Sequence, residues 1–484
     1  MAKTFRLLKA GGTPPAKRSS RQVPHAPMVT FSNLIDSAGS DSFYSVIIGN
    51  NGTGKSRLLG AIASEFAGIH QSDASGRGRR PSRLGVLDSI IDGDLSSGLS
   101  PSGRLPSRVI AVALTPVDKF PLEPSGDGGD FPLGEIADSR DDVSFYHYVG
   151  MRDRTNRASI SALIYRAVEG LGRRQSLENA ARLRSVFEML GYQPRITTRL
   201  KLSLGQDVQD FLQGRRGIEG DDADARLMQR IRALAASGGY RERELRAKLG
   251  QFIETWGTKT KLELELDFSG EAPPPSFDVE TLRLLRRLGA LSLSSVDVWR
   301  ADGVRHDLRD ASSGQIGILT VFLSIAAHLR DGSLVLIDEP ETSLHPEWQS
   351  KYIHLMREAF ADYSGCHFIF STHSPHIVAD IPQGSWIYSM DRATSVSSEA
   401  LLGRSPDFVM ANAFDVVGPT NYYLRDVLAD ALRLVGERQI NSDEFKAQLA
   451  ELVRLAANME GGEQVKQIVQ DLQVAQAELA PDGG

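Results

Sequence analysis

The chain has 484 residues, 41% of them hydrophobic and 24% charged, which is enough apolar material for one large domain with insertions or two domains sharing a core. The net charge of -6 excludes a general attraction to nucleic acid or anionic lipid, and the single cysteine, Cys366, excludes a disulfide framework. No stretch approaches the roughly 18 apolar residues of a membrane span, and residues 1–28 lack the apolar region of a secretory signal. We therefore expect a cytoplasmic protein without membrane contact.

A glycine-rich loop follows the first predicted strand, residues 44–48. The loop reads Gly49-Asn50-Asn51-Gly52-Thr53-Gly54-Lys55-Ser56, and apolar residues then recur at helical spacing. This order of strand, loop and helix matches GxxxxGK[ST], in which backbone N–H groups and a helix N-terminus hold phosphate. We expect ATP here, with Lys55 at the β- and γ-oxygens and Ser56 binding Mg²⁺. An ordinary glycine-rich turn is the alternative.

The next predicted feature is a flexible excursion at residues 71–107, followed by a buried strand at residues 108–114. The excursion carries the best local basic patch for nucleic acid, which consists of Arg77, Arg79, Arg80 and Arg83. Arg173 and Arg174 are a weaker candidate, and for both the alternative is a solvated loop.

The middle of the chain, residues 151–290, is predicted to be an inserted and mainly helical lobe. Amphipathic patterns run through residues 160–171, 177–190 and 227–252. Residues 261–266 alternate strictly and predict one short strand among these helices.

Two acidic residues end the apolar run of residues 334–337. A buried strand that delivers Asp338 at its C-terminal end places a carboxylate beside the metal of a phosphate-loop site. The adjacent Glu339 would then orient and deprotonate the attacking water. Two solvent-facing acids after a core strand are the alternative.

A histidine follows the next apolar run, residues 367–370, in the sequence Ser371-Thr372-His373-Ser374. At a strand end His373 could hydrogen-bond the γ-phosphate and distinguish ATP from ADP, although an isolated histidine is more often structural. His345 is predicted to shape a loop at a dimer contact.

A second anion-binding helix start is predicted just before the helical run of residues 316–329. It comprises Ser312, Ser313, Gly314 and Gln315, although a plain N-cap serine would explain the stretch equally well.

The last segment, residues 401–484, is helical by pattern. One predicted apolar stripe consists of Leu424, Val427, Leu428, Ala431, Leu432 and Val435, and a second of Leu449, Leu452, Val453 and Ala456. The acids Asp407, Asp415 and Asp426 have no strand context for a metal cluster. We therefore expect no nuclease in this chain.

In order, GNNGTGKS, ASSGQ, LVLIDEPETSLHP and STHSP resemble the Walker A, signature, Walker B with D-loop, and H-loop motifs of ABC-type ATPases. The endings ETSLHP and STHSP are similar to the RecF, SMC and OLD branch. Two features depart from the pattern: Ala311 and Ser313 replace the expected leucine and glycine of the signature, and no Q-loop glutamine follows residues 108–114.

The resemblance implies an α/β fold: an ABC-type head formed by residues 1–150 and 291–400, the inserted lobe at 151–290, and C-terminal helices at 401–484. It also implies a head-to-head dimer in which Ser312 and Gly314 of one protomer reach the γ-phosphate held by Lys55 of the other. Stand-alone heads of this kind resemble the ATPase subunits of anti-phage systems such as Septu, retrons and PARIS. We expect a slow ATPase switch that controls a separate effector, a nuclease or toxin, with DNA as a further candidate partner. The alternatives are a RecF-like DNA-repair ATPase and the energising subunit of a transporter.

Overall fold

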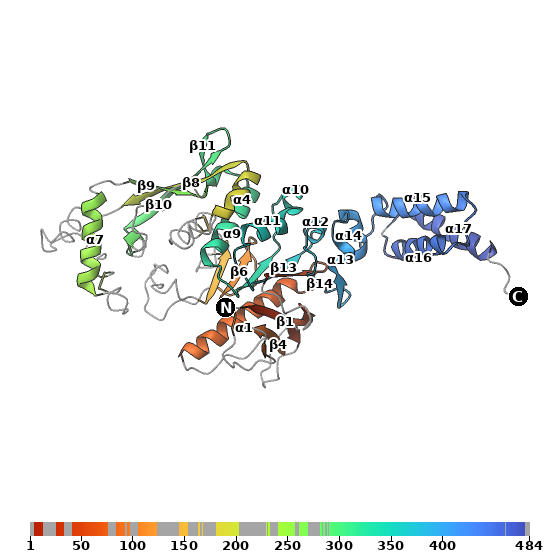
Figure 1. Cartoon of the computed structure of the whole chain (residues 1–484), viewed down its shortest axis with the longest axis horizontal. Helices are drawn as coiled ribbons and strands as arrows, with labels where there is room; N and C mark the ends of the chain where they lie inside the picture. The colour runs from red at the N-terminus through yellow and green to blue at the C-terminus, as the bar shows by residue number, and fades with distance from the viewer. Residues whose placement is uncertain are drawn as a thin grey trace.

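The structure is a computed structural model of the whole chain (Figure 1). The residues that it describes are 4–12, 26–32, 41–75, 84–91, 94–96, 105–122, 145–152, 163–164, 167, 181–202, 229, 231–232, 241–256, 261–269, 281–282, 284–285, 288, 290–459 and 461–479.

A seven-stranded sheet in the order β15-β14-β3-β13-β12-β6-β7 forms the centre of the ATPase-like part. Its strands are β3 (Phe43–Ile48), β6 (Val109–Ala113), β7 (Tyr146–Gly150), β12 (Leu334–Asp338), β13 (His367–Thr372), β14 (Trp386–Ser389) and β15 (Thr394–Ser397). Neighbouring strands are parallel, except for the antiparallel hairpin of β14 and β15. The predicted mixed α/β class with a parallel sheet is confirmed, and the short apolar runs are its buried strands.

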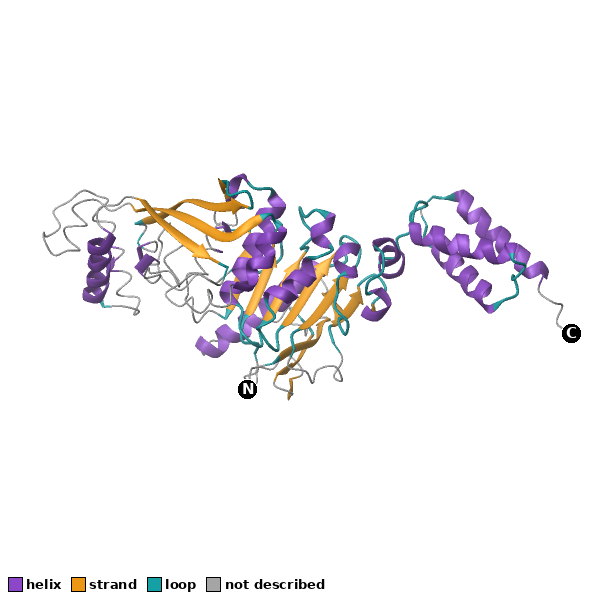
Figure 2. Cartoon of the chain, turned by 45° about the horizontal axis from the view of Figure 1, so that its top comes forward, coloured by secondary structure: helices purple, strands orange, loops and turns teal. Residues whose placement is uncertain are grey.

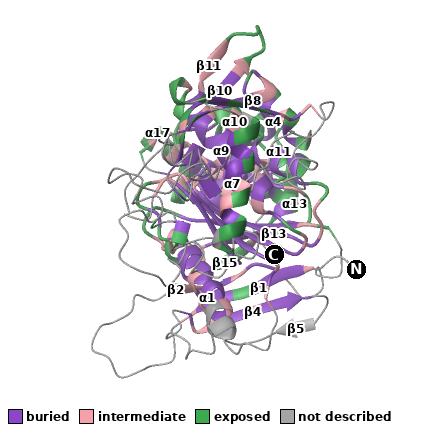
Figure 3. Ribbon diagram, turned by 90° about the vertical axis from the view of Figure 1, so that its left-hand side faces the viewer, coloured by how far each residue is buried: buried purple, intermediate pink, exposed green. Residues whose placement is uncertain are grey.

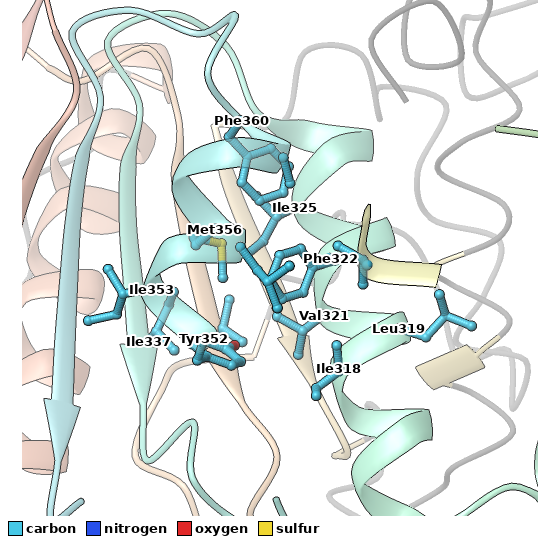
Figure 4. Close-up of a cluster of buried hydrophobic side chains, with 14 of the residues drawn as sticks. Ile318, Leu319, Val321, Phe322, Ile325, Ile337, Tyr352, Ile353, Met356 and Phe360 are labelled. Carbon is cyan, nitrogen blue, oxygen red and sulfur yellow. The ribbon is translucent and has the colours of Figure 1, made fainter. Parts of the chain in front are cut away.

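Layers of helices and strands cover both faces of this sheet. Along β12, Val335 and Ile337 belong to one core, while Leu334 and Leu336 belong to another, because successive side chains of a strand point to opposite faces. The first core is completed by α9 (Ser313–His328) and α11 (Tyr352–Ala359), whose apolar side chains meet in Figure 4. The second is completed by α1 (Lys55–Ser75) and an N-terminal sheet. In Figure 3 the strands of the central sheet are coloured mostly as buried.

The N-terminal sheet has the antiparallel order β2-β1-β4-β5. Its strands are β1 (Phe5–Gly12), β2 (Ala26–Thr30), β4 (Val86–Ile91) and β5 (Asp94–Ser96). Phe5 and Leu7 of β1 share a core with Ile62 and Phe66 of α1, so this sheet packs against the helix that follows the loop.

The inserted lobe corrects one expectation, since strands form a large share of its described residues. Two strands of the lobe, β8 and β9, belong to a second antiparallel sheet of order β11-β10-β8-β9, whose other two strands lie beyond residue 290. Its strands are β8 (Tyr192–Leu202), β9 (Lys261–Asp267), β10 (Leu291–Arg300) and β11 (Arg305–Asp307). Only β9 was predicted, although Ile196, Thr198, Leu200 and Leu202 alternate with Arg195, Thr197, Arg199 and Lys201. The periodic signal of β8 was therefore present but overlooked.

Helical elements of the lobe agree only partly with the predicted stretches. They include η2 (Ala181–Leu183), α4 (Arg184–Met189), which falls within residues 177–190, and α7 (Glu242–Trp256), which overlaps residues 227–252. The apolar side of α7 packs with Leu262 and Leu264 of β9 in a separate core. β11 leads through η3 (Leu308–Asp310) directly into α9.

The C-terminal part is helical, as predicted (Figure 2). The short helices α13 (Ser398–Leu401) and α14 (Pro406–Ala413) lead to α15 (Tyr422–Gly436), α16 (Asp443–Ala457) and α17 (Glu463–Leu479). Two further short helices, α10 (Pro346–Gln349) and α12 (Pro375–Ala379), lie in the head, after β12 and β13. Helices α15, α16 and α17 share a core of their own and project from the head in Figure 1. One member of the predicted stripe is wrong: Leu432 is 46% exposed, and Leu434 is buried in its place.

Candidate functional site

The phosphate loop lies between β3 and α1. Gly52 and Gly54 have φ of 84° and 100°, in the left-handed region that favours glycine, so the backbone can curl before the helix begins at Lys55. Thr53 closes the turn, because its Oγ1 donates to the carbonyl of Asn50 at 2.9 Å. The loop therefore has the strand, curl and helix N-terminus that a phosphate-binding loop needs.

The ammonium group of Lys55 points back along this loop. Its Nζ donates to the carbonyl oxygens of Gly49 and Asn50, at 2.8 and 3.1 Å, and to Nδ1 of His373 at 3.3 Å. Burial lowers the pKa of Lys55, and nearby carboxylates, led by Glu339, oppose the shift. A buried cation held by three acceptors inside a glycine loop is suited to phosphate oxygens, which would replace these acceptors.

Asp338 ends β12 in a buried position beside two serines. Ser371 of β13 donates a hydrogen bond to its Oδ1, and the hydroxyl of Ser56 is a second partner. Burial raises the pKa of Asp338 to about 6, while the two serine hydrogen bonds act to lower it. Ser56 and Asp338 thus present hard oxygen donors together, as Mg²⁺ prefers. Within the described ranges no group of three or more His, Cys, Asp or Glu side chains could hold a metal alone.

Glu339 adopts an unusual backbone conformation at the end of the same strand. Its φ is 48°, and its N–H donates to the carbonyl of Ser371 at 2.9 Å. A left-handed non-glycine residue costs on the order of 1–3 kcal/mol and persists only where its surroundings hold it. The turn directs the Glu339 carboxylate, one-third exposed, toward Nε2 of His373 at 3.6 Å.

His373 follows β13 and lies between Lys55 and Glu339. Because a lysine ammonium only donates, Nδ1 of His373 accepts and Nε2 carries the hydrogen that faces Glu339. Burial, and secondly the charge of Lys55, lowers the pKa of His373. The ring is therefore neutral at physiological pH and has one N–H to offer an acceptor.

Sequence reasoning missed Glu341. Its Oε1 accepts the backbone N–H of His373 at 2.5 Å, and its Oε2 is buried without a hydrogen-bond partner among the described residues. Burial raises the pKa of this carboxyl group, and its hydrogen bonds oppose the shift. Glu341 thus holds the backbone of His373. Its position in the same acidic run as Asp338 and Glu339 was the available signal.

The signature stretch begins α9. Ser312 and Gln315 form a reciprocal capping box: Ser312 Oγ accepts the Gln315 N–H at 3.2 Å, and Gln315 Oε1 accepts the Ser312 N–H at 3.1 Å. Ser312 and Ser313 are exposed. Gly314 is buried, and a Cβ there would lie 2.6 Å from the carbonyl oxygen of Ser343. The signature therefore packs against the segment that follows Glu339 in the same chain.

The loop after β6 holds an aspartate where no Q-loop glutamine was found. Asp118 is buried, and its carboxylate accepts hydrogen bonds from the Tyr148 hydroxyl at 2.6 Å and from Arg152 Nε at 2.8 Å. The charge of Asp118 contributes to raising the pKa of Asp338. The loop also touches α1, since a Cβ on Gly60 would lie 2.3 Å from the carbonyl oxygen of Lys119. Asp118 was not predicted.

The remaining predicted residues are placed as follows. Asn51 is exposed in the phosphate loop, and His345 is the N-cap of α10, whose Nδ1 accepts the Glu347 N–H at 3.3 Å. Arg77, Arg79, Arg80, Arg83, Arg173 and Arg174 lie outside the described residues. None of the helices in the described ranges is long and apolar enough to cross a membrane.

Comparison with known proteins supports part of this assignment. A family model described as "AAA domain, putative AbiEii toxin, Type IV TA system" matches residues 186–379, which include the signature, Asp338 and His373 but not Lys55. No curated protein matches the chain. The geometry and the family match agree on one coarse assignment. The chain contains an ATPase domain of the P-loop class.

Two solved structures are also similar in part. A nucleotide-free ATP-binding cassette from an ABC transporter is 10% identical, with coverage of 81% of this chain and 90% of that chain and a TM-score of 0.26. The Smc head domain with an extended coiled coil, bound to the C-terminal domain of ScpA and derived from Pyrococcus furiosus, is 12% identical, with coverage of 82% and 97% and a TM-score of 0.30. Because both TM-scores are low, the ATPase assignment rests on the geometry of the candidate site and not on these two structures.

Proposed function

We propose that this chain is an ATP-binding and ATP-hydrolysing switch that dimerises head to head and controls a partner effector, a nuclease or toxin, in anti-phage defence. The observation that carries the ATPase part is the meeting of Lys55, Asp338, Glu339 and His373 at the carboxyl ends of three adjacent parallel strands. Ligands of open α/β sheets bind at this edge.

ATP with Mg²⁺ fits the residues present. Lys55 and the curled loop would hold the phosphates, and Ser56 and Asp338 would hold Mg²⁺, which neutralises charge on the β- and γ-oxygens. Glu339 would orient the attacking water and accept its proton, while the neutral His373 would donate its Nε2–H to a γ-phosphate oxygen. Glu341 would keep His373 in place through the backbone.

The exposed start of α9 supports the composite site. Ser312 already accepts one hydrogen bond in its capping box, so its hydroxyl hydrogen can be donated to an anion outside the helix. Such a helix N-terminus also attracts negative charge. In the proposed dimer the anion is the γ-phosphate on the partner subunit. The contact of Gly314 with Ser343 would then link that phosphate to the segment that carries Glu339.

Two observations support control of an effector. The matching family model is described as a putative toxin of a type IV toxin–antitoxin system, which is a statement about that family. The C-terminal helices α15 to α17 form a separate core and carry exposed Tyr422, Leu432 and Val474. We propose them as the docking element for the effector. The RecF-like alternative stays a prediction, and a steeply salt-dependent affinity for plain duplex DNA would favour it.

Mixing two inactive variants tests whether the site is shared between protomers. Lys55→Ala removes the phosphate contact, and Ser313→Arg blocks the exposed signature surface. If sites are shared, the mixture contains heterodimers with one intact site, and a 1:1 mixture should regain roughly a quarter of wild-type ATPase activity. Ser395→Arg, at an exposed position of β15, is the control and should keep full activity. Activity in Ser313→Arg alone, or no recovery on mixing, would reject the shared site.

A further inference from the structure

The turn between β14 and β15 lies against the phosphate loop. Asp391 Oδ2 accepts the backbone N–H of Asn50 at 2.8 Å, and the N–H of Met390 donates to the carbonyl of Ile48 at 2.9 Å. A Cβ added to Gly49 would lie 3.2 Å from Met390 Cβ and 3.3 Å from Asp391 Oδ2. The turn therefore fits closely against the backbone of the loop, and neither can shift far without the other.

The next residue of the same turn reaches in the other direction. Arg392 forms a two-pronged ion pair with Asp415, through Nε and Nη2, and both side chains are about one-third exposed. Asp415 has φ of 55° and follows the end of α14. A two-pronged guanidinium–carboxylate pair fixes direction as well as distance, so the turn and this segment are held in one relative orientation.

Asp415 is in turn attached to the C-terminal bundle, which we define as α15, α16 and α17. Asn458, at the end of α16, donates to Asp415 Oδ1 at 3.3 Å, and Arg454 of α16 lies 4.0 Å from the same oxygen. Arg454 also donates to the carbonyl of Ala411 at 3.3 Å and to Asn412 Oδ1 at 2.9 Å. Polar contacts therefore run without a break from Asn50 to α16.

Apolar packing supports the same connection. In α14, Val409 and Ala413 belong to the core of the head, whereas Ala411 belongs to the core of the C-terminal bundle. α14 also packs against α12, which begins directly after His373 and Ser374. The bundle is thus joined through α14 and α12 to the segment that carries His373, and through the turn to the phosphate loop.

We propose that the Asp391–Arg392 turn is a positioning element that couples nucleotide occupancy of the phosphate loop to the placement of the C-terminal bundle. Asp391 holds the loop through Asn50, and Arg392 holds the bundle through Asp415. Phosphates bound at Lys55 place new negative charge near the Asp391 carboxylate, which weakens its contact with the loop and shifts the turn. This inference rests on the proposed ATP binding.

Thermodynamic linkage requires that ATP binding and the placement of the bundle affect each other equally. If ATP changes the placement of the bundle by some factor, then disruption of that placement must change ATP affinity by the same factor. The test therefore measures both ATP affinity and the state of the bundle.

The experiment measures ATP affinity by calorimetry and backbone hydrogen exchange over residues 414–459 in the full-length chain. In the wild type, saturating ATP should change exchange in this region about 5-fold or more. Arg392→Gln and Asp415→Asn should each still bind ATP, with an affinity changed by about the same factor, and lose that ATP-dependent change. Asp391→Asn keeps an acceptor for Asn50 but removes the charge, so it should bind ATP and show a smaller change. Arg433→Gln, which removes exposed ion pairs with Asp430, Glu437 and Glu444 but leaves the turn and Asp415 intact, should behave as wild type.

Three results overturn a claim, and they are distinguishable. No ATP binding by the wild type would reject the proposed function. ATP binding without altered exchange in residues 414–459 would reject the coupling alone. An undiminished ATP-dependent change in both Arg392→Gln and Asp415→Asn, with melting temperatures like the wild type, would show that another route carries the signal.

Discussion

The ammonium nitrogen of Lys55 lies 3.3 Å from Nδ1 of His373, although the two residues are 318 positions apart in the chain. The contact makes the histidine an acceptor toward the lysine and leaves Nε2–H for Glu339. One pair of side chains thus joins the start of α1 to the end of β13.

Replacement of Lys55 by alanine should abolish ATP binding, because it removes the buried ammonium group that the structure places at the loop carbonyls of Gly49 and Asn50. It should also raise the pKa of His373, since the charge of Lys55 now lowers it. Calorimetry measures the first effect and the ring proton signals of His373 across a pH titration measure the second. Lys351→Ala, which removes an exposed pair with Glu347, is the control. Tight ATP binding by Lys55→Ala would remove the phosphate-loop assignment.

Substitution of Glu339 by glutamine should trap an ATP-bound dimer. The amide keeps the shape of the side chain but cannot accept the proton from water, so ATP would bind without turnover. Light scattering after size exclusion, with and without ATP and Mg²⁺, measures the mass. Glu347→Gln, at an exposed position of α10, should remain able to hydrolyse ATP. A variant that binds ATP and stays monomeric would contradict the shared site.

Two glycines of α1 should respond oppositely to alanine. At Gly60 a Cβ would lie 2.3 Å from the carbonyl oxygen of Lys119, and this backbone can move only by shifting the loop that holds Asp118. We expect Gly60→Ala to lower the free energy of unfolding by about 1–3 kcal/mol. Around an added Cβ at Gly68, no described atom beyond the neighbouring residues and the backbone of the helix itself lies within 4 Å, so alanine should raise the free energy of unfolding by up to about 1 kcal/mol through helix propensity. Chemical denaturation measures both. Equal effects at the two sites would contradict the close approach.

The C-terminal bundle should lose stability in acid through Glu451. Hydrogen bonds from Arg454 lower the pKa of Glu451 below its ordinary 4.5. A lowered pKa in the folded state contributes stability above pH 4.5 that is lost as pH falls through the lowered value. The melting temperature of the bundle should therefore fall less in Glu451→Gln than in the wild type between pH 5 and strong acid. Glu463→Gln, at an exposed position, should follow the wild type, and an unchanged slope in Glu451→Gln would exclude this pair as the cause.

The sequence by itself determined the elements in which the signal is local. A phosphate loop needs a strand, glycines that tolerate left-handed φ and a helix start, all within about 12 neighbouring residues, so Gly49 to Ser56 could be identified without the fold. The same is true of the apolar strands that deliver Asp338 and His373. The alternation in β8 is equally local, but it lies between stretches of helical periodicity, which favour a helical interpretation of the whole region.

Only the tertiary structure decided which distant residues meet. Asp391 caps Asn50 from 341 positions away, and Arg152 holds Asp118 across a segment outside the described residues. Neither acid carries a local pattern, because its role depends on the order of strands in the sheet and on backbone approaches that composition does not record. Local periodicity specifies elements, whereas the contacts between them follow from how their apolar faces are buried together.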